Sequence, residues 1–469
     1  MAKTYVGSHL RRLRESHRLS QVALADRLGI SASYLNQLER GKRPLTVSVL
    51  IRVTEEFGVD ADFFATRDAA RLAADVRTAL REHIATGKVS ETDIAELTSQ
   101  MPEIAAAMVA MHRRQQDTVD QTAALLESHA GHGAVSVGPQ PHEEVRDFFY
   151  ARHNHVAELD DIAEETAARW ELEPENARER LVAELAHRHG VRVVSVDDDA
   201  IQHRLDVRQR VLYLAARLAP GQQAFRMATQ LALLEHRDLI ARLADAAGFA
   251  TDTAKQLARI GLANYFAGAL ILPYGRIRAR AEEYRYDVER LAEHFEVGFE
   301  TICHRLSTLQ RPRQRGVPFS FIRVDRAGNI SKRQSATGFH FSKAGGTCPL
   351  WTVYEAFAMP DRLLVQVAAM PDNRRYLWLA KTVRYRRGGY RSPGKEFAIG
   401  LGCELRHARK LVYSQGLDLN DPDAATPIGM GCKVCERVDC AQRAFPPVGG
   451  SLRVDERAGT FIPYPTIRK

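Results

Sequence analysis

The sequence predicts a multidomain protein with an all-α amino-terminal module, an α-rich α+β middle domain and an α+β, Cys-rich carboxy-terminal domain. Its 469 residues are enough for several domains of ordinary size. Helical periodicity dominates up to about residue 310, whereas short apolar runs of strand length recur after residue 318. Five of the six cysteines lie in this last part of the chain.

Turn-forming residues and changes in periodicity set the expected boundaries. Gly and Pro interrupt the helical pattern at residues 130–141, and RPRQRGVP marks a second boundary at 311–318. We place the four domains at residues 1–65, 66–129, 142–310 and 318–469. The domain at 66–129 is expected to be a helical connector or oligomerisation segment. Short strands are expected at 191–196 and 211–214, within the domain at 142–310.

Composition and charge narrow the class of protein. Hydrophobic residues make up 45% and charged residues 26%, as in folded globular proteins. No run approaches the roughly 18 apolar residues of a membrane span, and the first residues lack the apolar core of a secretion signal. We therefore expect a cytoplasmic protein without a membrane partner, whose cysteines are thiols or metal ligands. The formal net charge of +8 favours a polyanionic partner.

The first 65 residues predict five short helices that include a helix-turn-helix. Ser20 and Ser31 are placed to cap successive helices, and Gly29 suits the turn between them. The second helix keeps Leu35 and Leu38 inward and turns polar side chains outward. Residues 1–58 carry ten Lys or Arg against five Asp or Glu. These features predict binding to double-stranded DNA.

The module resembles the phage-repressor type of helix-turn-helix. Outward side chains of its second helix would read base edges, and Gln21 and the two cations beyond that helix would meet phosphates. Such modules bind weakly alone, so we expect a homodimer or tetramer on a repeated half-site. The candidate DNA-binding residues are Gln21, Ser31, Ala32, Ser33, Tyr34, Asn36, Gln37, Lys42 and Arg43.

The middle domain resembles the metallopeptidase-like domain that is often fused behind such modules. In that family a His-Glu-x-x-His helix precedes an Ala-Asn-x-Phe-Ala segment, here residues 263–267. The family's His, Glu and His positions are Thr229, Gln230 and Leu233, which supply neither zinc ligands nor a general base. We expect a degenerate, non-enzymatic ImmA/IrrE-like domain. A displaced metal site near Glu235 and His236 is conceivable, although ordinary surface residues are the better interpretation.

Three cysteines in a C-x2-C-x4-C run, Cys432, Cys435 and Cys440, predict a metal or cluster site that needs a fourth ligand. Cys403, directly after a predicted strand, is our first choice, and Cys348 is the second. An iron-sulfur cluster is favoured over zinc, because structural zinc usually takes two close Cys pairs and this sequence has only one. Zinc is the alternative.

Basic residues gather just before Cys403. Between Arg374 and Lys395 the sequence has eight Lys or Arg, no acid, and interleaved aromatic residues. This pattern suits a ligand with phosphates and a flat ring, or a second nucleic-acid contact. A solvated basic hairpin is an equally strong interpretation. The candidate cofactor-binding residues are Arg384, Arg386, Arg387, Arg391 and Lys395.

The whole chain resembles the short-chain fatty acyl transcriptional regulators, on the segments TYVGSHLRRLR, TCPLW and GCKVCERVDCAQRAFPP. The resemblance implies control of acetate and propionate metabolism, including glyoxylate-shunt and methylcitrate-cycle genes, with acyl-coenzyme A as effector. It also implies a four-iron, four-sulfur (4Fe-4S) cluster in some members. Two alternatives stay open: a cluster-based redox sensor that ignores acyl-coenzyme A, and a peptidase that cleaves a repressor.

Overall fold

The computed structural model divides into two compact units, residues 1–138 and 139–468, which are described separately. Its description covers residues 7–465 except for a set of short gaps. The gaps are residues 17–18, 41–42, 44–45, 58–71, 74, 78, 81–88, 113, 116–139, 199–200, 337–347, 387–390, 392–393, 433–434, 436, 447–451 and 455–456. Among the described residues, no helix combines the length and hydropathy of a membrane span.

The first unit begins with four helices around a small apolar core. They are α1 (Gly7–Ser16), α2 (Gln21–Arg27), α3 (Ala32–Glu39) and α4 (Val47–Phe57). The predicted caps are confirmed: the Ser20 hydroxyl accepts from the Ala23 N–H and the Ser31 hydroxyl from the Tyr34 N–H, both at 3.1 Å. Gly29 has a φ of +59°, which the turn between α2 and α3 requires. Leu35 and Leu38 are buried, as predicted.

A second, smaller core lies in the segment predicted as a connector. It contains α7 (Glu91–Gln100) and a helical run at 102–112. Val76, Ile94, Ala105 and Val109 form its buried cluster. The predicted fifth helix and most of the predicted linker at 130–141 lie outside the described residues.

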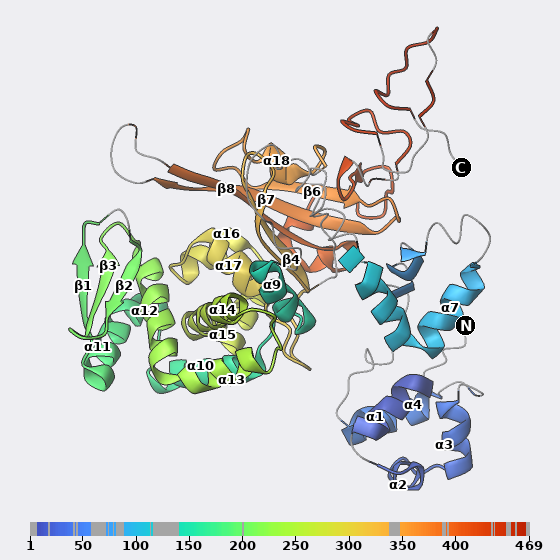
Figure 1. The fold of residues 1–469 in the computed structure, drawn as a ribbon, viewed down its shortest axis with the longest axis horizontal. Helices are drawn as coiled ribbons and strands as arrows, with labels where there is room; N and C mark the ends of the chain where they lie inside the picture. Colours follow the sequence, from blue (N-terminus) through green and yellow to red (C-terminus); the bar gives the residue numbers. More distant parts are fainter. Residues whose placement is uncertain are drawn as a thin grey trace. The chain divides into compact units, whose positions relative to one another are not determined.

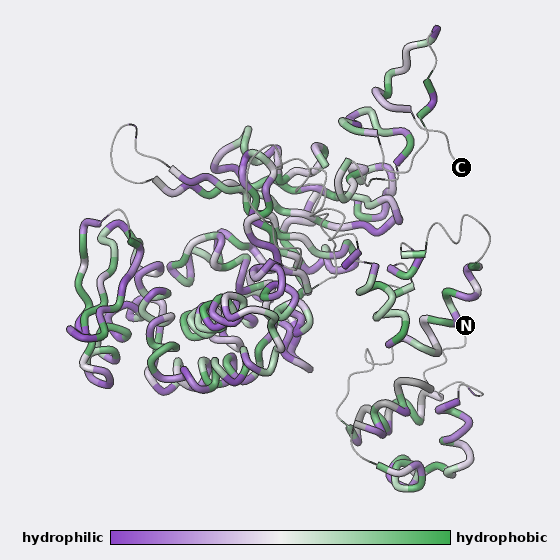
Figure 2. Tube along the Cα trace, viewed as in Figure 1, coloured by the Kyte–Doolittle hydropathy of each residue, from purple (hydrophilic) through white to green (hydrophobic). Residues whose placement is uncertain are grey.

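The second unit contains a helical layer built around the long helix α14 (Figure 1). Helices α9, α10, α12 and α13 pack against α14, and Figure 2 shows the hydrophobic residues that run along it. The helices of this layer and its surroundings are α9 (Pro141–Ala151), α10 (Ala157–Arg169), α11 (Ala177–His189), α12 (Pro220–Glu235), α13 (Arg237–Asp245), α14 (Asp252–Ile271), α15 (Tyr274–Glu283), α16 (Val288–His294) and α17 (Phe299–Leu306). The short helix α18 (Thr352–Glu355) packs instead on strands β6, β7 and β8 of the six-stranded sheet described below.

A three-stranded sheet adjoins this helical layer. Its strands β1 (Arg192–Val196), β2 (His203–Asp206) and β3 (Val211–Ala215) follow the order β1-β3-β2. Both strands predicted here are confirmed, as β1 and β3. The polar strand β2 was not predicted, because its sequence HRLD has no apolar run.

A six-stranded sheet follows in the order β5-β4-β8-β7-β6-β9, and it is antiparallel except between β6 and β9. The strand-length apolar runs predicted after residue 318 include FSFIRV, LLVQVAAM, RYLWLAKTV and EFAIGL, and they form β4, β6, β7 and β8. Strand β5 was missed because its sequence ISKRQS is polar. The strands are β4 (Phe319–Val324), β5 (Ile330–Ser335), β6 (Leu364–Ala369), β7 (Arg375–Arg386), β8 (Gly394–Glu404) and β9 (Thr426–Pro427).

The helical layer and the six-stranded sheet share one hydrophobic core. Leu231 and Phe266 from the helices and Phe321 and Leu401 from the strands belong to the same buried cluster. Residues 311–318, where we predicted a domain boundary, therefore connect α17 to β4 inside one compact unit. This shared packing brings residues of both segments around one cavity.

Candidate functional site

The second unit contains a cavity of about 1630 Å³. Helices α9, α12, α14 and α17 supply one part of its lining, and strands β4, β5, β7 and β8 supply another. Small-molecule sites usually measure about 300–1,000 Å³. The cavity is therefore large enough for an extended ligand.

The described lining of this cavity is strongly cationic. It has nine Lys or Arg side chains against two acids, Glu143 and Glu300. Charges of one sign in a cleft focus the field and attract an oppositely charged ligand. The cavity is therefore suited to a polyanion. The cationic side chains are Arg146, Arg217, Arg226, Arg305, Arg323, Lys332, Arg333, Arg384 and Lys395.

Aromatic side chains line the same cavity. They are Phe149, Phe225, Tyr265, Tyr385 and Phe397. Rings of this kind offer a face for a flat heterocycle and apolar surface for an alkyl chain. With the surrounding cations, they make the cavity suitable for a ligand that carries phosphates, a ring and an apolar arm.

Glu300 on α17 organises one wall of the cavity. Its carboxylate accepts from Arg323 Nη1 at 2.9 Å and from the Tyr385 hydroxyl at 3.1 Å, which ties α17 to β4 and β7. Arg226 donates to Gln202 at 2.6 Å, and burial lowers the pKa of its guanidinium. A cation held in this way gains stability when an anion binds beside it.

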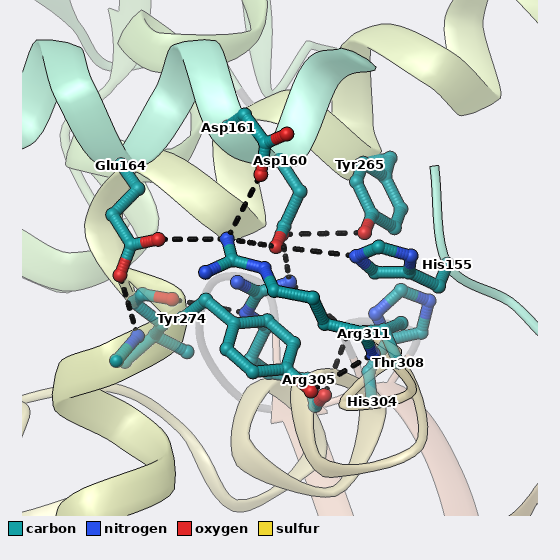
Figure 3. Close-up of polar contacts among 12 residues, drawn as sticks. His155, Asp160, Asp161, Glu164, Tyr265, Tyr274, His304, Arg305, Thr308 and Arg311 are labelled. Atoms are coloured by element: carbon teal, nitrogen blue, oxygen red, sulfur yellow. Dashed lines mark hydrogen bonds and ion pairs between the residues drawn. The ribbon is translucent and has the colours of Figure 1, made fainter. Parts of the chain in front are cut away.

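A buried network of polar contacts surrounds Asp160 (Figure 3). The fully buried Asp160 carboxylate is 2.8 Å from Arg305 Nη1 and 3.0 Å from Arg311 Nη2, and it accepts from the Tyr265 hydroxyl at 3.2 Å. Burial alone would raise the pKa of Asp160, but the charge of Arg305 and hydrogen bonds from His155 and Arg305 lower it well below its usual value. The network therefore orients Arg305 and Tyr265, which both line the cavity.

Two of the predicted cofactor-binding residues, Arg384 and Lys395, line this cavity. Arg391 is exposed and is not among the lining residues, whereas Arg387 and the Arg386 side chain lie outside the described residues. Sequence reasoning missed Arg226 and Arg323. A signal was available, since each is a lone cation inside an otherwise apolar run, AFRMA and FSFIRV.

The positions that correspond to the metallopeptidase motif hold no metal-binding group. Thr229 is buried, and its hydroxyl bonds to the Phe225 carbonyl at 2.8 Å and to Asn264 at 3.2 Å. Glu235 instead pairs with Arg188 at 2.6 Å and His189 at 2.8 Å. Within the described parts of the chain, no three His, Cys, Asp or Glu side chains are arranged to hold a metal ion.

The cysteine triplet lies beside Cys348. Cys348, Cys432, Cys435 and Cys440 line one small cavity, closed on one side by Gly429, where an added Cβ would lie 2.5 Å from Cys435 Sγ. The loop is held by buried Arg443, which donates to the carbonyls of Cys432 at 3.2 Å and Cys435 at 3.1 Å. Four cysteines are a donor set whose chemistry suits iron or zinc, but in this structure their sulfur atoms are not arranged as the ligands of one metal ion.

Cys403, our first choice as the fourth ligand, lies elsewhere. Side chains alternate between the two faces of a strand. On β8, Cys403 shares the face of Leu401 and Ile399, within the main core. Cys348 belongs to the core on the opposite face, with Trp378 and Ala398. The structure therefore places the second choice, Cys348, beside the triplet.

The predicted DNA-reading residues lie on and beside α3. Ser31 and Ser33 are exposed, and Ala32, Tyr34, Asn36 and Gln37 are partly exposed. Arg43 is exposed, with its guanidinium 5.9 Å from the centroid of the Tyr34 ring, whereas Lys42 lies outside the described residues.

Gln21 has a structural contact that the sequence did not reveal. Its side-chain nitrogen donates to Glu39 at 2.8 Å, and Glu39 also accepts from Arg14 at 2.7 Å. This contact ties α1 and α2 to α3.

Three family models match successive parts of the chain. They are described as helix-turn-helix (residues 10–64), IrrE N-terminal-like domain (186–307) and short-chain fatty acyl coenzyme A regulator, C-terminal (308–464). The chain is 52% identical to the HTH-type transcriptional regulator RamB of Mycobacterium tuberculosis, over 99% of each chain. It is 42% identical to a propionyl-CoA carboxylase regulator of Cereibacter sphaeroides, over 98% of each.

A solved structure also resembles the chain. It is described as a Mycobacterium tuberculosis transcriptional regulator and is 53% identical in sequence. The match has a TM-score of 0.68 and covers 69% of this chain and 99% of that one.

Proposed function

The chain belongs to the short-chain fatty acyl coenzyme A regulators, and we propose that it binds a DNA operator with an affinity that changes when an acyl-coenzyme A occupies the large cavity. The observation that carries this proposal is the composition of the cavity lining. Nine cationic side chains, two acids and five aromatic rings surround a cavity of about 1630 Å³. The Cereibacter relative is named a propionyl-CoA carboxylase regulator, which supports the proposal that the target genes belong to short-chain acyl metabolism.

An acyl-coenzyme A matches the chemistry of the cavity part by part. Its phosphates suit the arginines and lysines, its adenine suits an aromatic face, and its acyl group suits the apolar surface. The degenerate peptidase motif supports a binding function for this domain, since Thr229, Gln230 and Leu233 supply neither metal ligands nor a base.

Ligand control requires that acyl-coenzyme A bind the DNA-competent and DNA-incompetent states with different affinities. We propose a homodimer or tetramer, because a single helix-turn-helix reads few base pairs and pairs of modules read repeated half-sites. Operator binding should be measured with acetyl-, propionyl- and free coenzyme A. An operator affinity that all three leave unchanged would contradict ligand control.

Replacing Arg226 with glutamine is expected to weaken acyl-coenzyme A binding by about 10- to 100-fold, because a hydrogen bond to a charged group contributes roughly 1.5–3 kcal/mol. Isothermal titration calorimetry measures this change. Lys255→Gln is the matched control, since Lys255 pairs with Asp245 outside the cavity lining. Equal affinities of the two variants would show that Arg226 does not hold the ligand.

We propose that Cys348, Cys432, Cys435 and Cys440 hold a 4Fe-4S cluster, with zinc as the alternative. Thiolates of four cysteines are the usual ligands of such a cluster, which can transfer electrons or stabilise a loop. The backbone N–H groups of Gly429 and Leu350 donate to the Cys348 sulfur, which favours its thiolate, although burial raises the pKa of this thiol overall.

Cys348→Ala is expected to abolish the cluster, whereas Cys403→Ala is expected to keep it. The physical reason is that the two cysteines lie on opposite faces of the sheet. Iron, sulfide and zinc should be measured on anaerobically purified protein. Loss of iron in Cys403→Ala but not in Cys348→Ala would contradict the assignment.

A further inference from the structure

The helical run at 102–112 of the first unit exposes a row of apolar side chains. Met101, directly before this run, is 47% exposed, Ile104 is 52% exposed and Met111 is 65% exposed. Met108, between them, is partly exposed. Single apolar side chains are common on protein surfaces, whereas a contiguous set of large ones indicates an interaction site. We call these four side chains the open row.

The spacing of the open row is that of a coiled-coil seam. Its members follow one another after three, four and three residues, which is the alternation of the a and d positions of a heptad. At about 100° per residue, Ile104, Met108 and Met111 lie within a stripe about 60° wide. Side chains in such a stripe pack between those of a second helix. The spacing therefore predicts a helical partner.

The core of the first unit covers a different side of this helix. Ala105 and Val109 are buried, and they belong to the small core with Val76 and Ile94. Each lies about 100° around the helix from the residue of the open row that precedes it. The helix is therefore apolar on two adjacent sides, and this core covers one of them.

The third side of the helix is an ordinary solvent face. Ala106 and Ala110 lie on it together with the charged residues Glu103 and Arg114, and all four are exposed. None of these four carries a large apolar side chain. The exposed apolar surface is thus concentrated on the open row instead of being spread around the helix.

Glu103 and Arg114 flank the open row at opposite ends of the helix. They lie about 20° apart around its axis, on the side of Met111 that faces away from Ala105. In an antiparallel pair of identical helices, the half with Glu103 of one copy runs beside the half with Arg114 of the other. In a parallel pair, like charges would be neighbours. Charges that flank a seam set the orientation of the helices, and these favour an antiparallel pair.

We propose that the open row is a dimer interface and that its partner is the open row of a second copy, in an antiparallel pair. This inference rests on the proposed function, in which two helix-turn-helix modules bind one operator. A two-fold interface must be complementary to itself. The open row satisfies this condition, because its spacing of three, four and three residues reads the same in both directions. The flanking charges change sign from one end to the other, so a reversed copy matches them too.

Pairing through the open row would join the two DNA-reading modules of a dimer. The open row and the recognition helix α3 belong to the same compact unit, so each row is connected to one module. A helix of eleven residues is about 16 Å long, so the pair buries less than the roughly 1,200 Å² of a standard interface. We therefore expect a reversible dimer, which an operator with two half-sites stabilises.

The test is the mass of the full chain in solution, measured by analytical ultracentrifugation over a range of concentrations. Ile104→Glu/Met111→Glu should weaken dimerisation by at least about 100-fold, because four like charges would meet in the seam of a dimer. A dissociation constant equal to that of the wild type would overturn the inference. A wild type that stays monomeric even on operator DNA would also overturn it, and the open row would then face another part of the same chain.

Ala106→Glu/Ala110→Glu is the matched control. It adds the same two carboxylates to the same helix, at exposed positions outside the open row. This variant should dimerise like the wild type, and equal weakening by both double variants would show that the open row has no special role. If Ile104→Glu/Met111→Glu lost its helical circular dichroism, Ile104→Gln/Met111→Gln would test the same seam with neutral side chains.

A charge swap tests the orientation of the pair. Glu103→Arg alone and Arg114→Glu alone should each weaken dimerisation by up to about 5-fold, the usual scale of an exposed ion pair. The double variant Glu103→Arg/Arg114→Glu should recover the affinity of the wild type. A double variant without this recovery would exclude the antiparallel pair.

Ligand binding separates this inference from the proposed function. The large cavity belongs to the second unit, so Ile104→Glu/Met111→Glu should bind acyl-coenzyme A as the wild type does in calorimetry. If this variant stays dimeric while acyl-coenzyme A changes the operator affinity of the wild type, the interface is wrong and the proposed function stands. If acyl-coenzyme A leaves that affinity unchanged, ligand control fails, and the masses of the two double variants still decide the interface.

Discussion

Replacing Asp160 with asparagine is expected to lower the free energy of unfolding by about 3–5 kcal/mol, the usual cost of removing one partner of a buried ion pair. The Asp160 carboxylate is fully buried, and the side chain of its partner Arg305 is only 3% exposed. Without the carboxylate, the Arg305 guanidinium would stay buried without a counter-charge. The asparagine amide keeps one acceptor oxygen, so it cannot replace the contacts of the carboxylate with Tyr265, Arg305 and Arg311 together.

Asp161→Asn is the matched control for this prediction. Asp161 is the next residue on α10 and is 3.2 Å from Arg311, but its side chain is 60% exposed. Exposed ion pairs contribute about 0–1 kcal/mol. Urea unfolding of both variants measures the difference, and similar destabilisation by the two substitutions would contradict a special role for the buried carboxylate.

The same carboxylate should make stability depend on pH in acid. The pKa of Asp160 is lower in the folded protein than its unfolded value of about 3.9. Its contribution is therefore fully present above about pH 4 and is lost as the pH falls toward the folded-state value. Unfolding curves between about pH 2 and 5 should be flatter for Asp160→Asn than for the wild type, and parallel curves would contradict this origin.

The double variant Ser33→Ala/Gln37→Ala is expected to lose most of its specific operator affinity. Both side chains lie on the recognition helix α3, where Ser33 is exposed and Gln37 partly exposed. Each side chain that reads a base edge contributes roughly 1–3 kcal/mol of discrimination. The proposed dimer on two half-sites would lose these contacts twice, so specific binding should approach the affinity for unrelated DNA.

Arg43→Gln provides the contrasting control. A phosphate-binding cation carries no sequence information, so its removal should weaken operator and unrelated DNA alike and reduce the salt dependence by about one unit of slope. Fluorescence anisotropy on both DNAs at several salt concentrations distinguishes the two variants. If the double variant lost affinity for both DNAs equally, α3 would not be the helix that reads the bases.

The sequence by itself determined the features that depend on neighbouring residues. Ser20 and Ser31 cap helices because each hydroxyl lies within three residues of the N–H that it accepts from. Gly29 forms the turn because the adjoining helices need a left-handed residue there. The strands β4, β6, β7 and β8 were predictable because each is an apolar run within the sequence itself, whereas the polar strand β5 contains no such run.

The tertiary structure decided which distant residues meet. Cys403 is closer in sequence to the triplet than Cys348 is, yet the alternation of β8 turns it to the opposite face of the sheet. The cavity likewise joins Arg226, His304, Lys332 and Lys395 from two helices and two strands. Helix and strand periods are local, so a sequence reveals them. Which face packs against which neighbour depends on burying one shared core, and only the folded chain specifies that.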